Sequence, residues 1–354
     1  MLLQITEHLK EDLLQEGSLL TNIPPEIQSA TTASYGVANA RLVPPTAQMH
    51  PVIQLNMVPT PIDISQYANP YGPTNPNGDT ISLFRFRELT NNIPDFETFY
   101  FSSGSYIEDV YANIVNGASS KPNATFTQQA FSNSIQKLAN SKLAALTIYP
   151  GSWCPVFASP SDWYTQVTQK QNLFSTSLNL QDPVSSVNQD FTVIGNQGTE
   201  SLDWNQINTQ GKVVSTPLNK GSVLNTVSYK FMVVQINRPW LDLSLFSMGG
   251  WYLAGQDTGF VSSGDATNNN GIMPLYTTAF ILATDLEITG SLQQADASLL
   301  ANNLDNNEAI NLGPFNISSI ISSPKSNNVT LSNNGYFIVA WISKIIGLAP
   351  KIDS

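Results

Sequence analysis

Charged side chains are scarce in this sequence. Asp, Glu, Lys and Arg make up 12% of the 354 residues, which is about half of their usual share in soluble proteins. Asn, Gln, Ser and Thr take their place, while hydrophobic residues keep a share of 41%, so the composition is not that of a disordered chain. Neutral hydrogen-bonding groups can meet another protein surface without the cost of desolvating charges. The composition therefore favours a protein that works through contact, by assembly or by binding.

Basic residues are the scarcer of the two signs. Fifteen Lys and Arg stand against 26 Asp and Glu, which gives a net charge of −11. Binding to phosphate groups requires clustered Lys and Arg, and the sequence contains no such cluster. We therefore expect no nucleic-acid partner. The same shortage argues against electrostatic attachment to anionic lipid.

Cysteine and histidine are nearly absent. Cys154 is the single cysteine, so no disulfide can form within the chain. His8 and His50 lie in unrelated contexts, and a zinc site of the usual Cys/His type cannot be assembled from these residues. We expect no metal and no cofactor.

Catalytic motifs are also missing. The sequence has no nucleophile elbow, no Walker A motif and no dinucleotide-binding glycine pattern. The tripeptide Asp257-Thr258-Gly259 matches the core of aspartic proteases, but a glycine-flanked turn explains it better, because no second copy of the tripeptide exists. We therefore name no catalytic residue and expect a protein that is not an enzyme.

The sequence has no long hydrophobic run. The longest covers residues 337–348 and contains Lys344. A run of this length is too short for a membrane-spanning helix. The first residues lack the basic and apolar regions of a secretory signal. We therefore expect a chain made in the cytoplasm, which could still be released or form part of an extracellular particle.

The N-terminal residues carry the clearest helical pattern. Leu2, Ile5, Leu9 and Leu13 recur at helical spacing between charged residues, which predicts an amphipathic helix that ends near Gly17. Such a helix is marginal alone, so its apolar stripe must dock on its own domain or on a neighbouring subunit. We favour the neighbour, because about sixty residues separate the helix from the first expected strand. The four apolar side chains are therefore predicted oligomer contacts.

Three parts of different character follow one another along the chain. Prolines punctuate residues 21–80, which predicts an extended arm with little regular structure. We expect residues 1–80 to form the helix and this arm, residues 81–185 a mixed α/β lobe, and residues 186–354 a β-rich core domain.

Hydrophobic periodicity predicts the main elements. Residues 81–87 and 97–102 are predicted as strands, and residues 128–146, 160–169 and 291–304 as helices. The strongest strands cover residues 227–236, 278–289 and 336–348, whose apolar middles indicate a sheet covered on both faces. The expected fold class is mainly β with a few helices (α+β), with a β-sandwich or jelly-roll-like C-terminal core.

One unusual cluster follows the first strong strand. Arg238, Trp240, Asp242 and Trp251 lie close together in the sequence. A guanidinium can stack on tryptophan and can bind a carboxylate through two of its nitrogens at once. The cluster can therefore be a platform for a small ligand or a glycan, or a structural corner pinned by an Arg–carboxylate pair. We favour the structural interpretation.

These observations leave three classes of function open. The leading hypothesis is a non-enzymatic, self-assembling structural protein, such as a subunit of a shell, filament, lattice or capsid-like particle, which would form a homo-oligomer. The second is a toxin-like, pore-forming β protein that contacts membranes, with residues 174–195 as a candidate amphipathic segment. The third is a glycan-binding protein or a glycan hydrolase that uses a pair of carboxylates.

Overall fold

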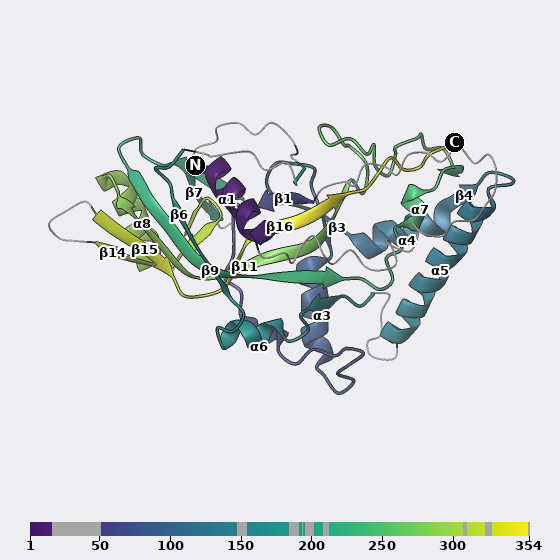
Figure 1. Ribbon diagram of the computed structural model, residues 1–354, viewed down its shortest axis with the longest axis horizontal. Helices are drawn as coiled ribbons and strands as arrows, with labels where there is room; N and C mark the ends of the chain where they lie inside the picture. Colours follow the sequence, from purple (N-terminus) through teal and green to yellow (C-terminus); the bar gives the residue numbers. More distant parts are fainter. Residues whose placement is uncertain are drawn as a thin grey trace.

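The fold is α+β and rich in β-strands, as the sequence predicts (Figure 1). The computed structural model describes residues 1–15, 51–146, 154–183, 191–192, 194, 202–207, 212–306, 310–322 and 328–352. The helices are α1 (Leu2–Gln15), the 3₁₀ helix η2 (Ile64–Tyr67), α3 (Thr80–Thr90), α4 (Ile107–Gly117), α5 (Thr125–Leu146), α6 (Trp163–Thr168), α7 (Ser244–Ser247) and α8 (Gln294–Asp305). The strands are β1 (Val52–Leu55), β2 (Asn92–Pro94), β3 (Ser102–Tyr106), β4 (Ala118–Ser120), β5 (Phe157–Ser159), β6 (Phe174–Asn179), β7 (Asp203–Ile207), β8 (Val213–Pro217), β9 (Val223–Asn237), β10 (Trp251–Leu253), β11 (Leu275–Ser291), β12 (Ile310–Leu312), β13 (Phe315–Ile317), β14 (Ser319–Ser322), β15 (Asn328–Asn333) and β16 (Phe337–Ile345).

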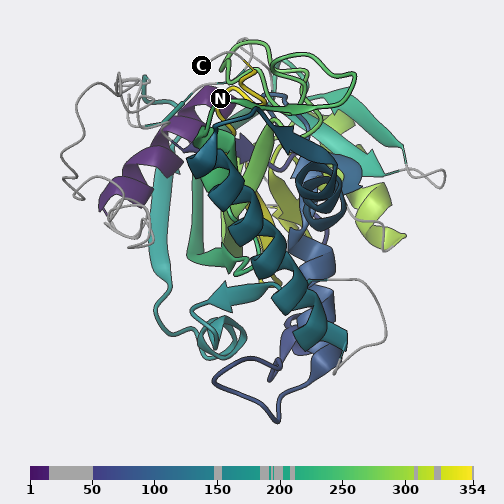
Figure 2. The ribbon, with the colours of Figure 1, turned by 90° about the vertical axis from the view of Figure 1, so that its right-hand side faces the viewer.

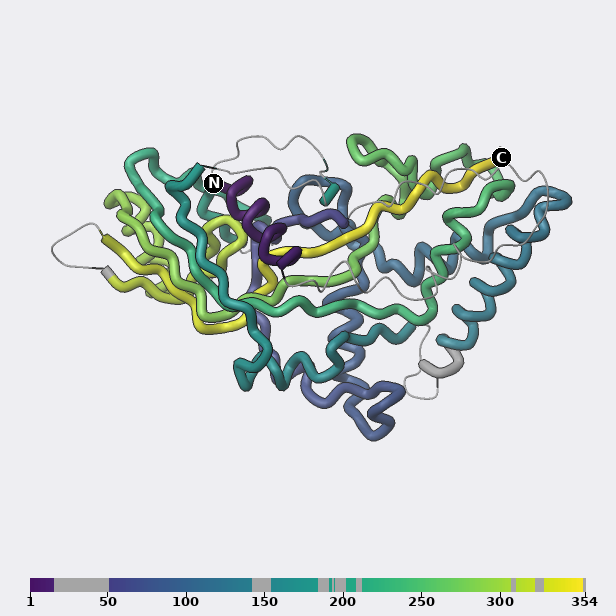
Figure 3. The backbone as a smooth tube through the Cα atoms, in the orientation of Figure 1, coloured from purple at the N-terminus to yellow at the C-terminus, as the bar shows by residue number. Residues whose placement is uncertain are grey.

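An eight-stranded sheet organises the molecule. Its two longest strands, β9 and β11, pair with each other and run side by side along much of the molecule (Figures 1 and 3). On its other side, β11 pairs first with β16 and then with β15, and the strand order along this path is β1-β16-β11-β15-β14. Strands β5 and β6 pair with the free side of β9. A second sheet has the order β13-β12-β7-β8, and β2–β3 and β4–β10 form two small pairs.

The three strongest predicted strands are confirmed as β9, β11 and β16. Each has a buried middle, because helices or other strands cover both faces of the large sheet there. The predicted helix at residues 291–304 is confirmed as α8, which begins three residues later. The more specific expectation of a β-sandwich or jelly roll stays a prediction.

The two largest hydrophobic cores of the described residues lie on opposite faces of the large sheet. The first contains Ile281 of β11 together with Trp204 of the second sheet, and it is closed by α1 and α8, which lie on either side in Figure 2. The second contains Phe280, whose ring centroid lies 5.9 Å from that of Trp163 and 5.5 Å from that of Trp341. Consecutive residues of β11 thus enter different cores, as the alternation of side chains along a strand requires.

The N-terminal helix is confirmed, but its apolar stripe is buried in the chain's own first core. Leu2, Ile5, Leu9 and Leu13 are each at most 4% exposed and belong to that core. Polar contacts also hold α1 against its own chain, because His8 Nε2 lies 2.8 Å from Thr176 Oγ1 of β6. This finding corrects the prediction that the four side chains contact a neighbour.

Residues 81–87 are helical, so the predicted strand is wrong. Asp79 caps α3 by accepting hydrogen bonds from the main-chain nitrogens of the next turn. The buried positions Leu83, Phe86, Arg87 and Thr90 follow the spacing i, i+3, i+4, i+7 of a helix face. Alternation of Phe and Arg over residues 84–87 satisfies the period of a strand equally well, and the cap decides between the two.

Two further segments differ from the sequence expectation. The predicted strand at residues 97–102 is wrong, because only its last residue, Ser102, belongs to a strand, β3. This segment instead lies against β1, where Gln54 Nε2 donates to the main-chain oxygen of Glu97 at 2.7 Å. In the predicted arm, residues 16–50 lie outside the described residues. Residues 51–80 contain the buried strand β1 and helix η2, so this part has more regular structure than predicted.

The helices predicted at residues 128–146 and 160–169 are present as α5 and α6, with different bounds. Helix α5 contains the predicted residues 128–146, but Ile135 is 45% exposed, while Thr127, Ser134 and Leu138 are buried. The helix predicted at residues 160–169 begins at Trp163, with Asp162 as its N-cap. None of the helices in the described part of the chain is long and apolar enough to cross a membrane.

Strands from all three predicted parts of the chain meet in the large sheet. Strand β1 lies in residues 1–80, β5 and β6 lie in residues 81–185, and the remaining strands of the sheet lie beyond residue 186. The proposed boundaries between domains stay a prediction.

Candidate functional site

Arg238 is the best-connected residue of the predicted cluster. At the C-terminal end of β9 its side chain turns toward the end of α3 and the start of β11. Nη2 donates to the main-chain oxygen of Thr90 at 2.6 Å and to Thr277 Oγ1 at 2.9 Å, and Nη1 donates to the main-chain oxygen of Thr277 at 2.5 Å. Nε donates to Asn91 Oδ1 at 2.7 Å. Arg238 therefore joins one helix to two strands.

The environment of Arg238 is that of a structural residue. All four of these acceptors are uncharged, and two of them belong to the last residue and the C-cap of α3, where the helix dipole favours a cation. Burial lowers the pKa of the guanidinium to about 10, and attraction from Glu108 only partly offsets this effect. The side chain has little room for a ligand, because the residue is 7% exposed and its donors already have partners.

The other three residues of the cluster do not converge on Arg238. Trp240 and Trp251 are fully buried in the second core, where their indole nitrogens donate to main-chain oxygens. Asp242 forms an ion pair with Lys137 of α5 at 3.2 Å and accepts a hydrogen bond from the main-chain nitrogen of Ser244. The structural interpretation thus fits each residue, although the expected Arg–carboxylate pair is replaced by contacts to neutral groups.

Sequence reasoning missed the partners of Arg238. Asn91 and Thr90 lie 147 and 148 residues earlier in the chain, and Thr277 lies 39 residues later. No local pattern connects these positions, because the antiparallel pairing of β9 with β11 and the packing of α3 bring them together.

No constellation for metal or protease chemistry is present in the part of the chain that the structure describes. No group of three or more His, Cys, Asp or Glu side chains there could hold a metal ion. The tripeptide at residues 257–259 lies in a turn, where Phe260 donates its main-chain N–H to the main-chain oxygen of Asp257 and Gly259 adopts a φ of +83°.

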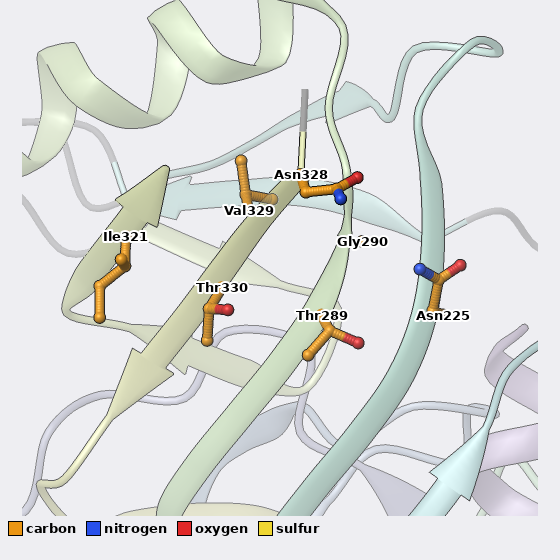
Figure 4. Close-up of a pocket in the computed structure, with 7 residues that line it drawn as sticks. All are labelled: Asn225, Thr289, Gly290, Ile321, Asn328, Val329 and Thr330. Carbon is orange, nitrogen blue, oxygen red and sulfur yellow. The ribbon is translucent and has the colours of Figure 1, made fainter. Parts of the chain in front are cut away.

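A shallow pocket lies on the large sheet far from this cluster (Figure 4). It has a volume of about 310 Å³ and is lined by Asn225, Thr289, Gly290, Ile321, Asn328, Val329 and Thr330. Gly290 allows β9 to approach closely, since a Cβ atom there would lie 2.4 Å from the main-chain oxygen of Val223. The lining offers neutral hydrogen-bonding groups and one aliphatic wall, and it contains neither an aromatic ring nor a charge.

The edge of the second sheet is the most exposed strand surface. All five residues of β8 are exposed, and Val213 and Val214 are each 45% exposed. Ile207 of β7, which stands directly opposite Val213, is 49% exposed. Exposed apolar side chains therefore stand on both faces of this edge, Val213 and Ile207 on one and Val214 on the other, and the outer edge of β8 pairs with no other described strand.

The chain itself covers three other strand edges. The outer side of β1 forms bridges with Phe99 and Thr192, α1 lies against β6, and β13 packs against β15. Strand β14 resembles β8, because its Ile321 is 67% exposed and it pairs only with β15 among the described strands.

Comparison with known proteins finds no matching family model, no similar curated protein and no similar solved structure.

Proposed function

We propose that the protein is a non-enzymatic structural subunit that assembles with copies of itself into a shell, filament, lattice or capsid-like particle. The observation that carries this proposal is the combination of exposed apolar side chains with an edge of β8 that no other described strand pairs with. Such an edge presents main-chain donors and acceptors to any strand that approaches it.

The charge distribution supports self-association at this edge. Proteins usually prevent an edge strand from pairing with another chain by lysine, proline, an inward-pointing charge, a bulge or a covering segment. The five residues of β8 contain no charge, and a proline stands only at the last position. A net charge of −11 on the whole chain opposes association of two copies, and salt screens that repulsion.

The two alternative functions have less support in the site geometry. The pocket of Figure 4 could accept a hydroxyl-rich ligand, but its lining lacks the aromatic surface on which sugar rings stack. Within the candidate membrane segment, β6 is paired with β9 as a regular member of the large sheet. We therefore place self-assembly ahead of glycan binding and membrane insertion.

The native mass of the full chain tests the proposal. Light scattering over a series of protein concentrations should show species larger than one chain at micromolar concentration, and the mass should rise with concentration. A monodisperse monomer at high concentration and physiological salt would refute the proposed function.

A further inference from the structure

We infer that β8 pairs antiparallel with the β8 of a second copy of this chain, around a two-fold axis that passes beside Val214. This inference rests on the proposed self-assembly and specifies its contact. A two-fold contact places the same surface on both partners, so the strand must be complementary to itself.

Pro217 indicates which residues of β8 direct their main-chain groups outward. Proline is tolerated in an edge strand where the missing N–H faces away from the existing ladder. Since main-chain direction alternates along a strand, Ser215 and Val213 share the outward direction of Pro217. The 2.7 Å hydrogen bond from Ser215 Oγ to Asn205 Oδ1 fits this assignment, because side chains approach most closely in pairs that are not bonded through the main chain.

These directions select one register for the pairing of two β8 strands. When Val214 stands opposite the Val214 of the second copy, each Val213 stands opposite a Ser215, and these outward-facing residues exchange main-chain hydrogen bonds. Pro217 lies beyond this pair at the end of the strand, where the β8 strand of the second copy no longer extends opposite it. A register centred on Ser215 instead places Pro217 opposite Val213 and loses bonds at both ends.

The side chains agree with the same register. Val214 lies on the same face of the sheet as Gln206, its direct partner, and as Trp204 two residues further along β7. Trp204 is fully buried in the first core, so the two Val214 side chains would meet on the face of the second sheet that points toward that core. Lys212 stands opposite Thr216 of the second copy rather than opposite another lysine, so the register creates no like-charge pair.

A single cysteine substitution tests both the contact and its register. The two Val214 positions form a pair without main-chain hydrogen bonds, for which the Cα separation is about 4.5 Å, and a disulfide requires roughly 4.4–6.8 Å. Val214→Cys should therefore become a covalent dimer under mild oxidation and migrate as a dimer on a denaturing gel without reductant. Cys154 is fully buried, and the unsubstituted protein measures its background.

Two matched variants make the experiment specific. Val223→Cys replaces a valine of nearly equal exposure, 43% against 45%, at a position of β9 that pairs with β11. Thr216→Cys lies on β8 itself, where the proposed register places it opposite residue 212. Each of these variants should form at least tenfold less covalent dimer than Val214→Cys under the same conditions.

The outcomes separate this inference from the proposed function. If the native mass shows an assembly but Val214→Cys gives no more covalent dimer than Val223→Cys, the β8 contact is wrong and self-assembly stands. If Thr216→Cys crosslinks as well as Val214→Cys, the register is wrong. A protein that is monomeric at every concentration overturns both proposals. Val214→Lys supplies a second measurement, since it should lower the native mass whereas Val223→Lys should not.

Discussion

Arg238 and Thr277 are joined twice, once through the main-chain oxygen of Thr277 and once through its hydroxyl. Thr277 Oγ1 also lies 3.1 Å from the main-chain oxygen of Thr90, so the same three residues close a small network between β9, β11 and the end of α3. A buried cation with only neutral partners is stable because the carbonyl groups at a helix C-terminus supply part of the missing negative potential.

Arg238→Ala should destabilise the protein much more than Arg85→Ala. The first change removes four hydrogen bonds to buried acceptors, which should lower the free energy of unfolding by about 2–4 kcal/mol. Arg85 is exposed and donates to Gln66, so its loss should change that free energy by about 0.5 kcal/mol or less. Urea denaturation of both variants measures the difference, and equal midpoints would contradict the assigned role of Arg238.

Leu9→Ala should destabilise each chain independently of assembly. Leu9 is fully buried in the first core, and truncating a buried leucine costs about 2–5 kcal/mol. Leu3→Ala is the matched control, because Leu3 lies on the same helix but is only partly buried. Thermal unfolding should show a lower midpoint for Leu9→Ala at every protein concentration. A loss of stability that appears only in the assembled protein would show that the stripe acts between chains.

Asp285→Asn should lower the free energy of unfolding at neutral pH and have little effect on it in acid. Burial raises the pKa of Asp285, but hydrogen bonds and attraction from Lys170 and Lys230 outweigh it and hold the pKa below its ordinary value. The folded state therefore favours the ionised carboxylate. Its contribution to the free energy of unfolding is present above the pKa that Asp285 has in the unfolded chain, and it is lost as the pH falls through the lower pKa of the folded state.

The expected size of this effect is small, because both lysines are largely exposed. The loss at pH 7 should be about 1 kcal/mol or less, and it should shrink as the pH falls below about 3.8. Asparagine tolerates the positive φ of 51° at this position, so the substitution tests the charge. Asp257→Asn, in an exposed turn, is the control. The free energies of unfolding of Asp285→Asn and the unsubstituted protein should converge at low pH. A difference that stays unchanged there would contradict the ion-pair explanation.

Assembly should respond only weakly to salt. The proposed contact through β8 uses main-chain hydrogen bonds and valine side chains, so screening has little attraction to weaken, and it relieves the repulsion between acidic chains. Sedimentation at about 0.05 and 0.5 M NaCl should give the same species, or slightly larger ones at the higher concentration. Dissociation into single chains at the higher salt would show that ion pairs hold the subunits together.

The sequence alone determined the elements whose hydrophobic period is unambiguous. The stripe of α1, the apolar middles of β9, β11 and β16, and the helix α8 could all be predicted, because side chains that share a face recur at a period set by the backbone itself. Where two periods fit the same residues, as in α3, the hydrogen bonds of Asp79 at the N-cap decided the outcome.

Tertiary structure alone decided which groups meet. The predicted cluster around Arg238 contained the right residue with the wrong partners, because its acceptors lie 39 to 148 residues away in the sequence. The α1 stripe was predicted to need a partner, and the packing of the first core showed that the chain supplies one. Which strand edges stay open, and hence where a second copy could bind, depends on the order of strands in each sheet. That order is set by non-local pairing, and the local period of side chains along each strand carries no information about it.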